Sequence, residues 1–154
     1  MSAVMLALLL QSASISGDLE FPAGMAAPTT VQVALLPLEY AKLFNAEAQQ
    51  NLDEYWEDFK PEFAARKETF LQIMPLAYNR ALEVVLSRMR RDTKINTANL
   101  IKTSPNGHFE FRGVLPGEYK LVATASIKGA DYVWTETLQV ETIPLSLLMK
   151  TRVP

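Results

Sequence analysis

The stretch SPNGHFEFRGVLPGEYKLVATA, from Ser104 to Ala125, contains the pattern that decides the fold. It holds two dipeptides typical of tight turns, Asn106-Gly107 and Pro116-Gly117, because glycine adopts backbone angles that other residues avoid. Around these turns, apolar residues alternate with polar ones at the period of two that a half-buried strand requires. The stretch therefore predicts short antiparallel strands joined by tight turns.

Strand patterns recur on both sides of this stretch. The chain from Ile15 to Pro37 reads as extended, and Val31, Val33 and Leu35 share one face at period two. After Gly129, the segment 132–143 alternates again, and a last strand is expected over 145–153. Several short strands separated by turns every eight to twelve residues or so predict a β-sandwich.

Between these strands the apolar residues recur every three or four positions, which is typical of amphipathic helices. Pro61 would break the interior of one long helix but suits a first turn, so two helices are expected, over 39–60 and 62–91. Pro75 lies inside the second and should kink it. Because both ends of this insert (39–92) must return to strands of one sandwich, the helices should form an antiparallel hairpin.

Composition limits the possible functions. At 154 residues the chain fits one domain with a substantial core. The formal net charge of -2 provides no basic excess for a nucleic-acid partner. The absence of cysteine removes disulfides and thiolate sites, and a single histidine, His108, excludes any multi-histidine metal site. We therefore expect no cofactor, no metal and no catalytic residues.

The N-terminal segment MSAVMLALLLQSASISG has the order of a secretory signal peptide, with an apolar run followed by small polar residues. This predicts a signal peptide over 1–14, cleaved near Ala13 or Ser14, and export to the periplasm, the cell envelope or the medium. No Lys or Arg precedes the apolar run, so a buried N-terminal helix or strand is the alternative. The run is too short for a transmembrane helix, and none is expected in the mature chain, 15–154.

The segment KTSPNGHFEFRGVLPGEYKLVATA resembles the carboxypeptidase regulatory-like domain, one of the transthyretin-like and starch-binding-like β-sandwiches. The likeness covers roughly 15–37 and 94–153. It departs from the family at Ser104, where the family usually has Asp, and in the helical insert. The resemblance implies an accessory, binding or spacing module without catalysis. The matching positions are Thr103, Gly107, Phe109, Phe111, Leu115, Pro116, Gly117, Tyr119 and Leu121.

Two polar features are candidate sites. The carboxylates Asp53, Glu54, Glu57 and Asp58 lie on adjacent helical turns, and oxygen-rich cation sites use such groups. A solvated helix face explains them better, because no calcium-loop pattern is present. His108 follows the Asn106-Gly107 turn and has no partner that the sequence identifies, so an exposed strand residue is the favoured interpretation.

Two aromatic sets remain. Tyr132 and Trp134 share a strand face and could stack sugars, although core packing is favoured for Trp134. The first helix could keep an apolar flank for a partner, through Tyr40, Phe44, Tyr55, Trp56 and Phe59. We expect an α+β fold, an antiparallel Ig-/transthyretin-like sandwich with an inserted helical hairpin. Its expected function is non-enzymatic docking of a partner protein or self-assembly through the hairpin, with carbohydrate binding as the alternative.

Overall fold

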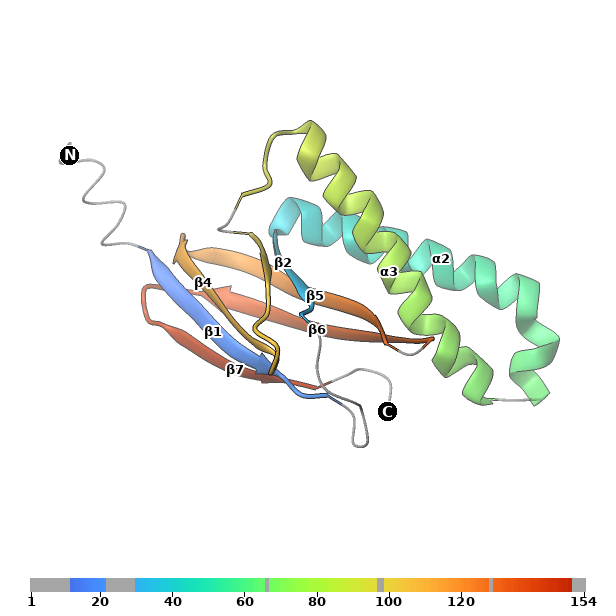
Figure 1. Cartoon of the computed structure of the whole chain (residues 1–154). Coiled ribbons are helices and arrows are strands. Elements are labelled where there is room, and N and C mark those ends of the chain that lie inside the picture. Colours follow the sequence, from blue (N-terminus) through green and yellow to red (C-terminus); the bar gives the residue numbers. More distant parts are fainter. Residues whose placement is uncertain (1–11, 22–29, 66, 97–98, 128, 151–154) are drawn as a thin grey trace.

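Two β-sheets pack face to face, and a hairpin of two long helices covers the outer side of one of them (Figure 1). The computed structural model describes residues 12–21, 30–65, 67–96, 99–127 and 129–150. Side chains are not described for residue 59 and residues 62–72. The architecture is α+β, as the sequence predicts.

The first sheet has the strand order β4-β1-β7. Its strands are β4 (His108–Val114), β1 (Ala13–Leu19) and β7 (Leu145–Met149). β1 pairs antiparallel with β4 but parallel with β7, from Ile15↔Leu145 to Leu19↔Met149. This parallel pair departs from the antiparallel sandwich we expected. It arises because the chain crosses from the second sheet to the first after β6, and β7 then runs in the direction of β1.

The second sheet has the order β3-β2-β5-β6. Its strands are β3 (Leu100–Lys102), β2 (Gln32–Pro37), β5 (Gly117–Ile127) and β6 (Ala130–Val140). β2 pairs antiparallel with β5, from Gln32↔Thr124 to Pro37↔Tyr119. The strands before and after the helical insert therefore lie side by side, which confirms that the two parts of the chain form one sandwich.

The core between the sheets contains large side chains from both. Trp134, Phe109 and Phe111 are among the largest fully buried residues. The indole Nε1 of Trp134 donates to the carbonyl oxygen of Glu20 at 3.0 Å. Thr103, the buried polar residue of this region, accepts the backbone N–H of Val31 on Oγ1 at 2.9 Å. The polar groups of this core are thus held by hydrogen bonds, as burial requires.

β2 is buried on both faces. Val33 and Leu35 point into the sandwich core, as their alternation predicts. Ala34 and Leu36, on the other face, are also fully buried because the helices pack on them. The continuous apolar run Val33–Leu36 is explained by this position between two cores.

The helices are α2 (Leu38–Ala65) and α3 (Lys67–Arg91), and they contact each other as a hairpin. The predicted boundary at Pro61 is wrong, since α2 continues through Pro61. A proline this close to a helix end removes one hydrogen bond from the last turns, which does not suffice to end the helix there. Pro75 lies inside α3, and the kink expected there stays a prediction.

Residues 1–11 of the expected signal peptide lie outside the described residues. The expected cleavage region falls within the sandwich, because Ala13 is buried in β1 and pairs with Val114. Cleavage after Ala13 or Ser14 would shorten β1 by one or two residues and leave Ile15, which is fully buried, in place. Export itself stays a prediction.

Candidate interaction site

The hairpin has a proximal half, 38–48 with 77–91, that packs on the second sheet. Ala34, Leu36 and Val122 supply the sheet side of this contact. The helices bury an apolar set against them: Tyr40, Ala41, Phe44, Ala48, Ala81, Leu82, Val85, Leu86 and Met89. Phe44 stacks on Tyr78 of α3, with ring centroids 5.8 Å apart. This second core fixes the hairpin on the sandwich.

The remaining part, 49–76, is the distal arm, and it projects past the edge of the sheets (Figure 1). Two contacts join its helices near its base. The Asn51 side chain donates to the carbonyl oxygen of Ala77 at 3.0 Å, and Arg80 donates to the Tyr55 hydroxyl at 2.6 Å. The Arg80 guanidinium also lies 5.8 Å from the centroid of the Tyr55 ring. These contacts tie the α2 side of the distal arm to the proximal part of α3.

The structure divides the aromatic residues proposed as a docking surface. Tyr40 and Phe44 are buried in the second core, so they hold the hairpin in place and are not accessible to a partner. Tyr55 is half-buried, whereas Trp56 keeps 44% of its surface exposed. The side chain of Phe59 lies outside the described residues. Of the five, Trp56 is the described residue that offers a large accessible apolar surface on the distal arm.

Trp56 stands in an acidic stretch, Glu47–Asp58, which carries five carboxylates and no Lys or Arg. Four of these carboxylates are exposed, namely Asp53, Glu54, Glu57 and Asp58. Side chains one turn earlier donate to two of them, with Gln49 bonding Asp53 at 2.8 Å and Gln50 bonding Glu54 at 3.3 Å. Within the described residues no group of three metal-ligating side chains comes together.

The other end of the hairpin is basic. Arg88, Arg90 and Arg91 occupy the last turn of α3, and Lys94 follows, all of them exposed. Asp92 accepts the Tyr40 hydroxyl at 2.7 Å and lies 3.8 Å from Arg88 Nε. The hydrogen bond to Asp92, with burial second, raises the pKa of Tyr40 to about 12. The same bond places this basic end beside the first turn of α2.

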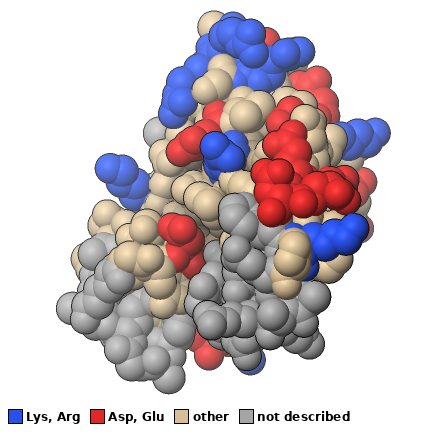
Figure 2. Space-filling model, turned by 90° about the vertical axis from the view of Figure 1, so that its right-hand side faces the viewer, with Lys and Arg blue, Asp and Glu red and all other residues tan. Residues whose placement is uncertain are grey.

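Figure 2 looks onto the side of the molecule from which the distal arm projects. It shows basic side chains gathered at the top, the level at which α3 ends in Figure 1, and acidic ones gathered below them. Among the described side chains of the hairpin, the charges are therefore mostly basic where α3 ends and mostly acidic over 47–58, although the net charge of the chain is only -2.

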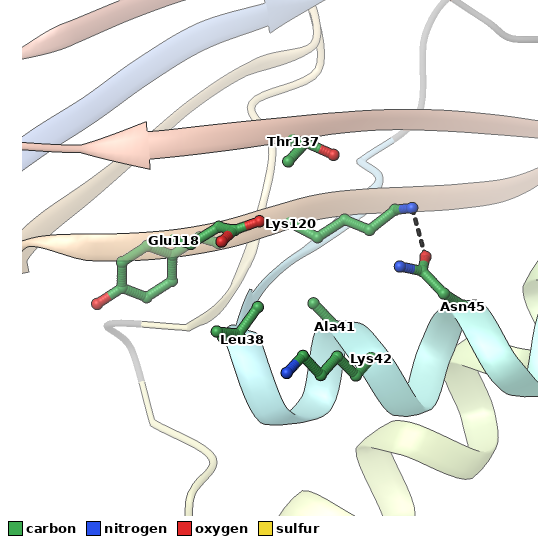
Figure 3. A pocket seen from close by; sticks show the side chains of 8 residues that line it. Leu38, Ala41, Lys42, Asn45, Glu118, Lys120 and Thr137 are labelled. Atoms are coloured by element: carbon green, nitrogen blue, oxygen red, sulfur yellow. Dashed lines mark hydrogen bonds between the residues drawn. The ribbon is translucent and has the colours of Figure 1, made fainter.

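A small pocket of about 170 Å³ lies where the start of α2 meets β5 and β6 (Figure 3). Lys120 of β5 donates to Asn45 Oδ1 at 2.6 Å, and its ammonium lies 5.3 Å from the Phe44 ring centroid. These contacts join β5 to α2. No local pattern in the sequence signals this pocket, because its lining comes from three elements: Leu38, Ala41, Lys42, Asn45, Glu118, Tyr119, Lys120 and Thr137.

Other residues noted in the sequence occupy the sandwich. His108 Nδ1 lies 3.1 Å from Asp18 Oδ1, a contact between β4 and β1 in which both side chains are about half exposed. The Tyr119 hydroxyl donates to the carbonyl oxygen of Leu115 at 2.8 Å, so the polar end of this tyrosine is paired with the backbone. Burial raises the pKa of Tyr119.

Trp134 is fully buried and Tyr132 is half-buried, with their ring centroids 6.4 Å apart. Phe21 packs edge-on against the indole of Trp134 at 5.7 Å. A sugar stacks on an accessible ring face, and Trp134 has none in this conformation. The core interpretation of Trp134 holds because its inward-facing position on β6 places it between the sheets.

The fold and the site define a β-sandwich protein with a projecting, charge-divided helical hairpin. No protein-family model matches the chain, and no curated protein matches it. A crystal structure of a candidate carbohydrate-binding protein from Pseudomonas aeruginosa is similar at 19% identity and a TM-score of 0.45, covering 92% of this chain and 90% of that one. The pilus backbone protein of Streptococcus pneumoniae is similar at 12% identity and a TM-score of 0.35, covering 90% of this chain and 41% of that one.

Neither likeness carries a functional argument at these scores. Among the described residues, no helix has the length and apolar character needed to cross a membrane.

Proposed function

We propose that this chain is an exported, non-enzymatic interaction protein whose helical hairpin makes the specific contact with a protein partner. The sandwich is the rigid base, and the distal arm is the contact element. The observation that supports the proposal most is the difference in packing between the two parts of the hairpin. Its proximal half is committed to the sheet, whereas its distal arm projects with Trp56 44% exposed among carboxylates.

Exposed aromatic residues surrounded by polar ones are typical of protein contact sites, where Trp contributes disproportionately to affinity. The resemblance to carboxypeptidase regulatory-like domains supports an accessory role, and the helical insert would give this chain a surface of its own. The proposal of export rests on the N-terminal segment. The proposal that the chain is not an enzyme rests on its having no cysteine and a single histidine.

A deletion that tests this function must leave the proximal half of the hairpin in place. Removing 41–91 would uncover Ala34, Leu36 and Val122, so the remaining sandwich would not be a fair control. Deleting 52–76 and joining Asn51 to Ala77 by a short Gly/Ser turn keeps the proximal half, since these two residues are already in contact at 3.0 Å. The truncated chain should fold and lose its partner.

The measurement is cross-linking and affinity recovery from the cells that make the protein, comparing the full chain, the truncated chain and Trp56→Ala. The truncated chain should recover none of the partner captured by the full chain, and Trp56→Ala should recover less. Equal recovery by the full and truncated chains would show that the distal arm is not the contact.

Carbohydrate binding through Tyr132 and Trp134 is the alternative class, and the burial of Trp134 argues against it. The chain has two tryptophans, so Trp56→Phe leaves Trp134 as the sole indole reporter. Saturable quenching of that variant's fluorescence by a polysaccharide would favour carbohydrate binding over the interaction role. We expect no quenching, because solvent and sugars do not reach the ring.

A further inference from the structure

We propose that the partner of the hairpin is a second copy of this chain, bound side by side and antiparallel, with each acidic stretch against the basic end of the other copy. The inference rests on the proposed function and assigns its partner. It depends on three properties of the described hairpin, which are the sign of the charge at each end, the exposure of those charges and the distance between them.

The acidic stretch is suited to a cationic surface. Its five carboxylates face no Lys or Arg within the stretch itself, and Lys42 and Lys60 flank it. From α3, Arg80 reaches the stretch at Tyr55 and gives its hydrogen bond to the hydroxyl. Among the side chains that the structure describes, the exposed carboxylates are therefore an excess of negative charge around Trp56, where burial against cationic side chains would offset like-charge repulsion.

The basic end supplies the complementary charge. Arg88, Arg90, Arg91 and Lys94 are four cations, and Asp92 is the one carboxylate among them, so the formal charge of 88–94 is +3. Asp92 is already engaged with Tyr40 and Arg88. The C-terminal dipole of α3 favours these cations in the monomer, but they remain exposed and available to carboxylates of another molecule.

The spacing of the two ends makes the contact reciprocal. The Tyr40–Asp92 hydrogen bond sets the basic end beside residue 40 of α2. Asp53 and Asp58 follow 13 and 18 positions later, which is about 20–27 Å along a helix that rises about 1.5 Å per residue. Two hairpins laid antiparallel therefore place both opposite-charge contacts in register at once, which is the self-complementary arrangement of a two-fold dimer.

A second copy fits this surface better than a partner of single charge, because each hairpin carries both signs at one fixed separation. That separation exceeds the Debye length of roughly 8 Å at physiological salt, so the two ends do not neutralise each other within one molecule. Exposed ion pairs are individually weak, so the charges set orientation and register while the apolar surface of Trp56 and its surroundings adds affinity.

The test measures self-association of the full chain by sedimentation velocity over a range of concentrations, at 50 mM and at 500 mM NaCl. We expect a dimer at low salt and a dissociation constant about tenfold higher at high salt, since salt screens contacts between exposed charges. Two double variants then change the charge of one end each by four units. Glu54→Lys/Glu57→Lys takes Glu47–Asp58 from -5 to -1, and Arg90→Glu/Arg91→Glu takes 88–94 from +3 to -1. Each alone should weaken the dimer by at least about tenfold, because the first variant loses most of the attraction at both contacts and the second replaces it with repulsion.

The decisive measurement mixes the two variants. In a mixed dimer, the introduced lysines meet the introduced glutamates, and the native basic end of one chain meets the native acidic stretch of the other. Because one of its two contacts is fully native, the mixture should form a heterodimer that binds more tightly than either variant binds itself. The matched control, Glu110→Lys/Glu141→Lys, changes as much charge on the sandwich, on β4 and after β6, and should leave the dimer unchanged.

The inference is overturned by a chain that stays monomeric at low salt, by a dimer that both reversals leave intact, or by a mixture that does not associate. Circular dichroism of each variant shows whether the helices are retained, so a loss of folding is separated from a loss of contact. A monomeric chain that still recovers a different protein through its distal arm would overturn the second copy as partner and leave the proposed function standing.

Discussion

Replacing Phe44 by alanine tests whether the hairpin is held as a rigid element. Phe44 is fully buried, stacks on Tyr78 with an angle of 15° between the ring planes, and carries the Lys120 ammonium above its ring. Truncating a buried phenylalanine costs about 3–5 kcal/mol, through lost transfer free energy and the cavity left behind. We expect a loss in this range, which is a large part of the 5–15 kcal/mol or so that stabilises a typical domain.

The assay is urea unfolding followed by two signals in a Trp56→Phe background. Far-UV circular dichroism reports mainly on the helices, and the fluorescence of Trp134 reports on the core between the sheets. With a slope of about 2 kcal/mol per M, the helical midpoint of Phe44→Ala should fall by about 1.5–2.5 M. The Trp134 midpoint should fall less, because Phe44 and Trp134 belong to different clusters on opposite faces of the second sheet.

Phe44→Leu is the matched control, since it keeps most of the apolar volume and should cost no more than about 1.5 kcal/mol. A loss below about 1 kcal/mol for Phe44→Ala would refute the reasoning, because it would mean that the proximal half is not packed on the sheet. Equal shifts of both signals would show instead that the two cores unfold as one cooperative unit.

Further substitutions test three local features. Gly107→Ala should destabilise the domain by about 2 kcal/mol or more in thermal unfolding, because φ is +87° and the new Cβ would meet a backbone oxygen at 2.8 Å; Gly129→Ala, with φ +79° and open space, should cost less. Thr103→Val removes the acceptor of a buried backbone amide and should cost about 1–3 kcal/mol in urea unfolding. The folded pKa of Tyr40 is raised from 10.0 to about 12, so its contribution to stability is present below pH 10 and is lost as the pH rises from 10 to about 12. Tyr40→Phe should therefore flatten the dependence of unfolding free energy on pH in this range. An unchanged slope in the variant would contradict this assignment.

The sandwich could be predicted because its signals are local. Asn106-Gly107 forms the expected turn, with the Gly107 amide donating to the Ser104 carbonyl at 2.9 Å, and the alternation of Phe109 and Phe111 sets both rings in the core. The parallel pairing of β7 with β1 could not be predicted, because it depends on which sheet the chain joins after β6.

The candidate site was predictable only in part. Helical periodicity gave the aromatic face of α2, but periodicity alone does not say where the supporting sheet ends. That edge decides that Phe44 is buried whereas Trp56 is 44% exposed. The partnership of Tyr40 with Asp92 joins residues 52 positions apart, and no local pattern signals it.

β2 passes into α2 without an intervening loop, since Pro37 ends the strand and Leu38 begins the helix. The direction of the arm is therefore set by the strand itself, and Leu36 and Ala34 seat it on the sheet. Force applied to the tip of the distal arm is therefore transmitted to the junction between β2 and α2. A partner that pulls on the arm would load the hydrogen bonds between β2 and β5 before it could swing the arm aside.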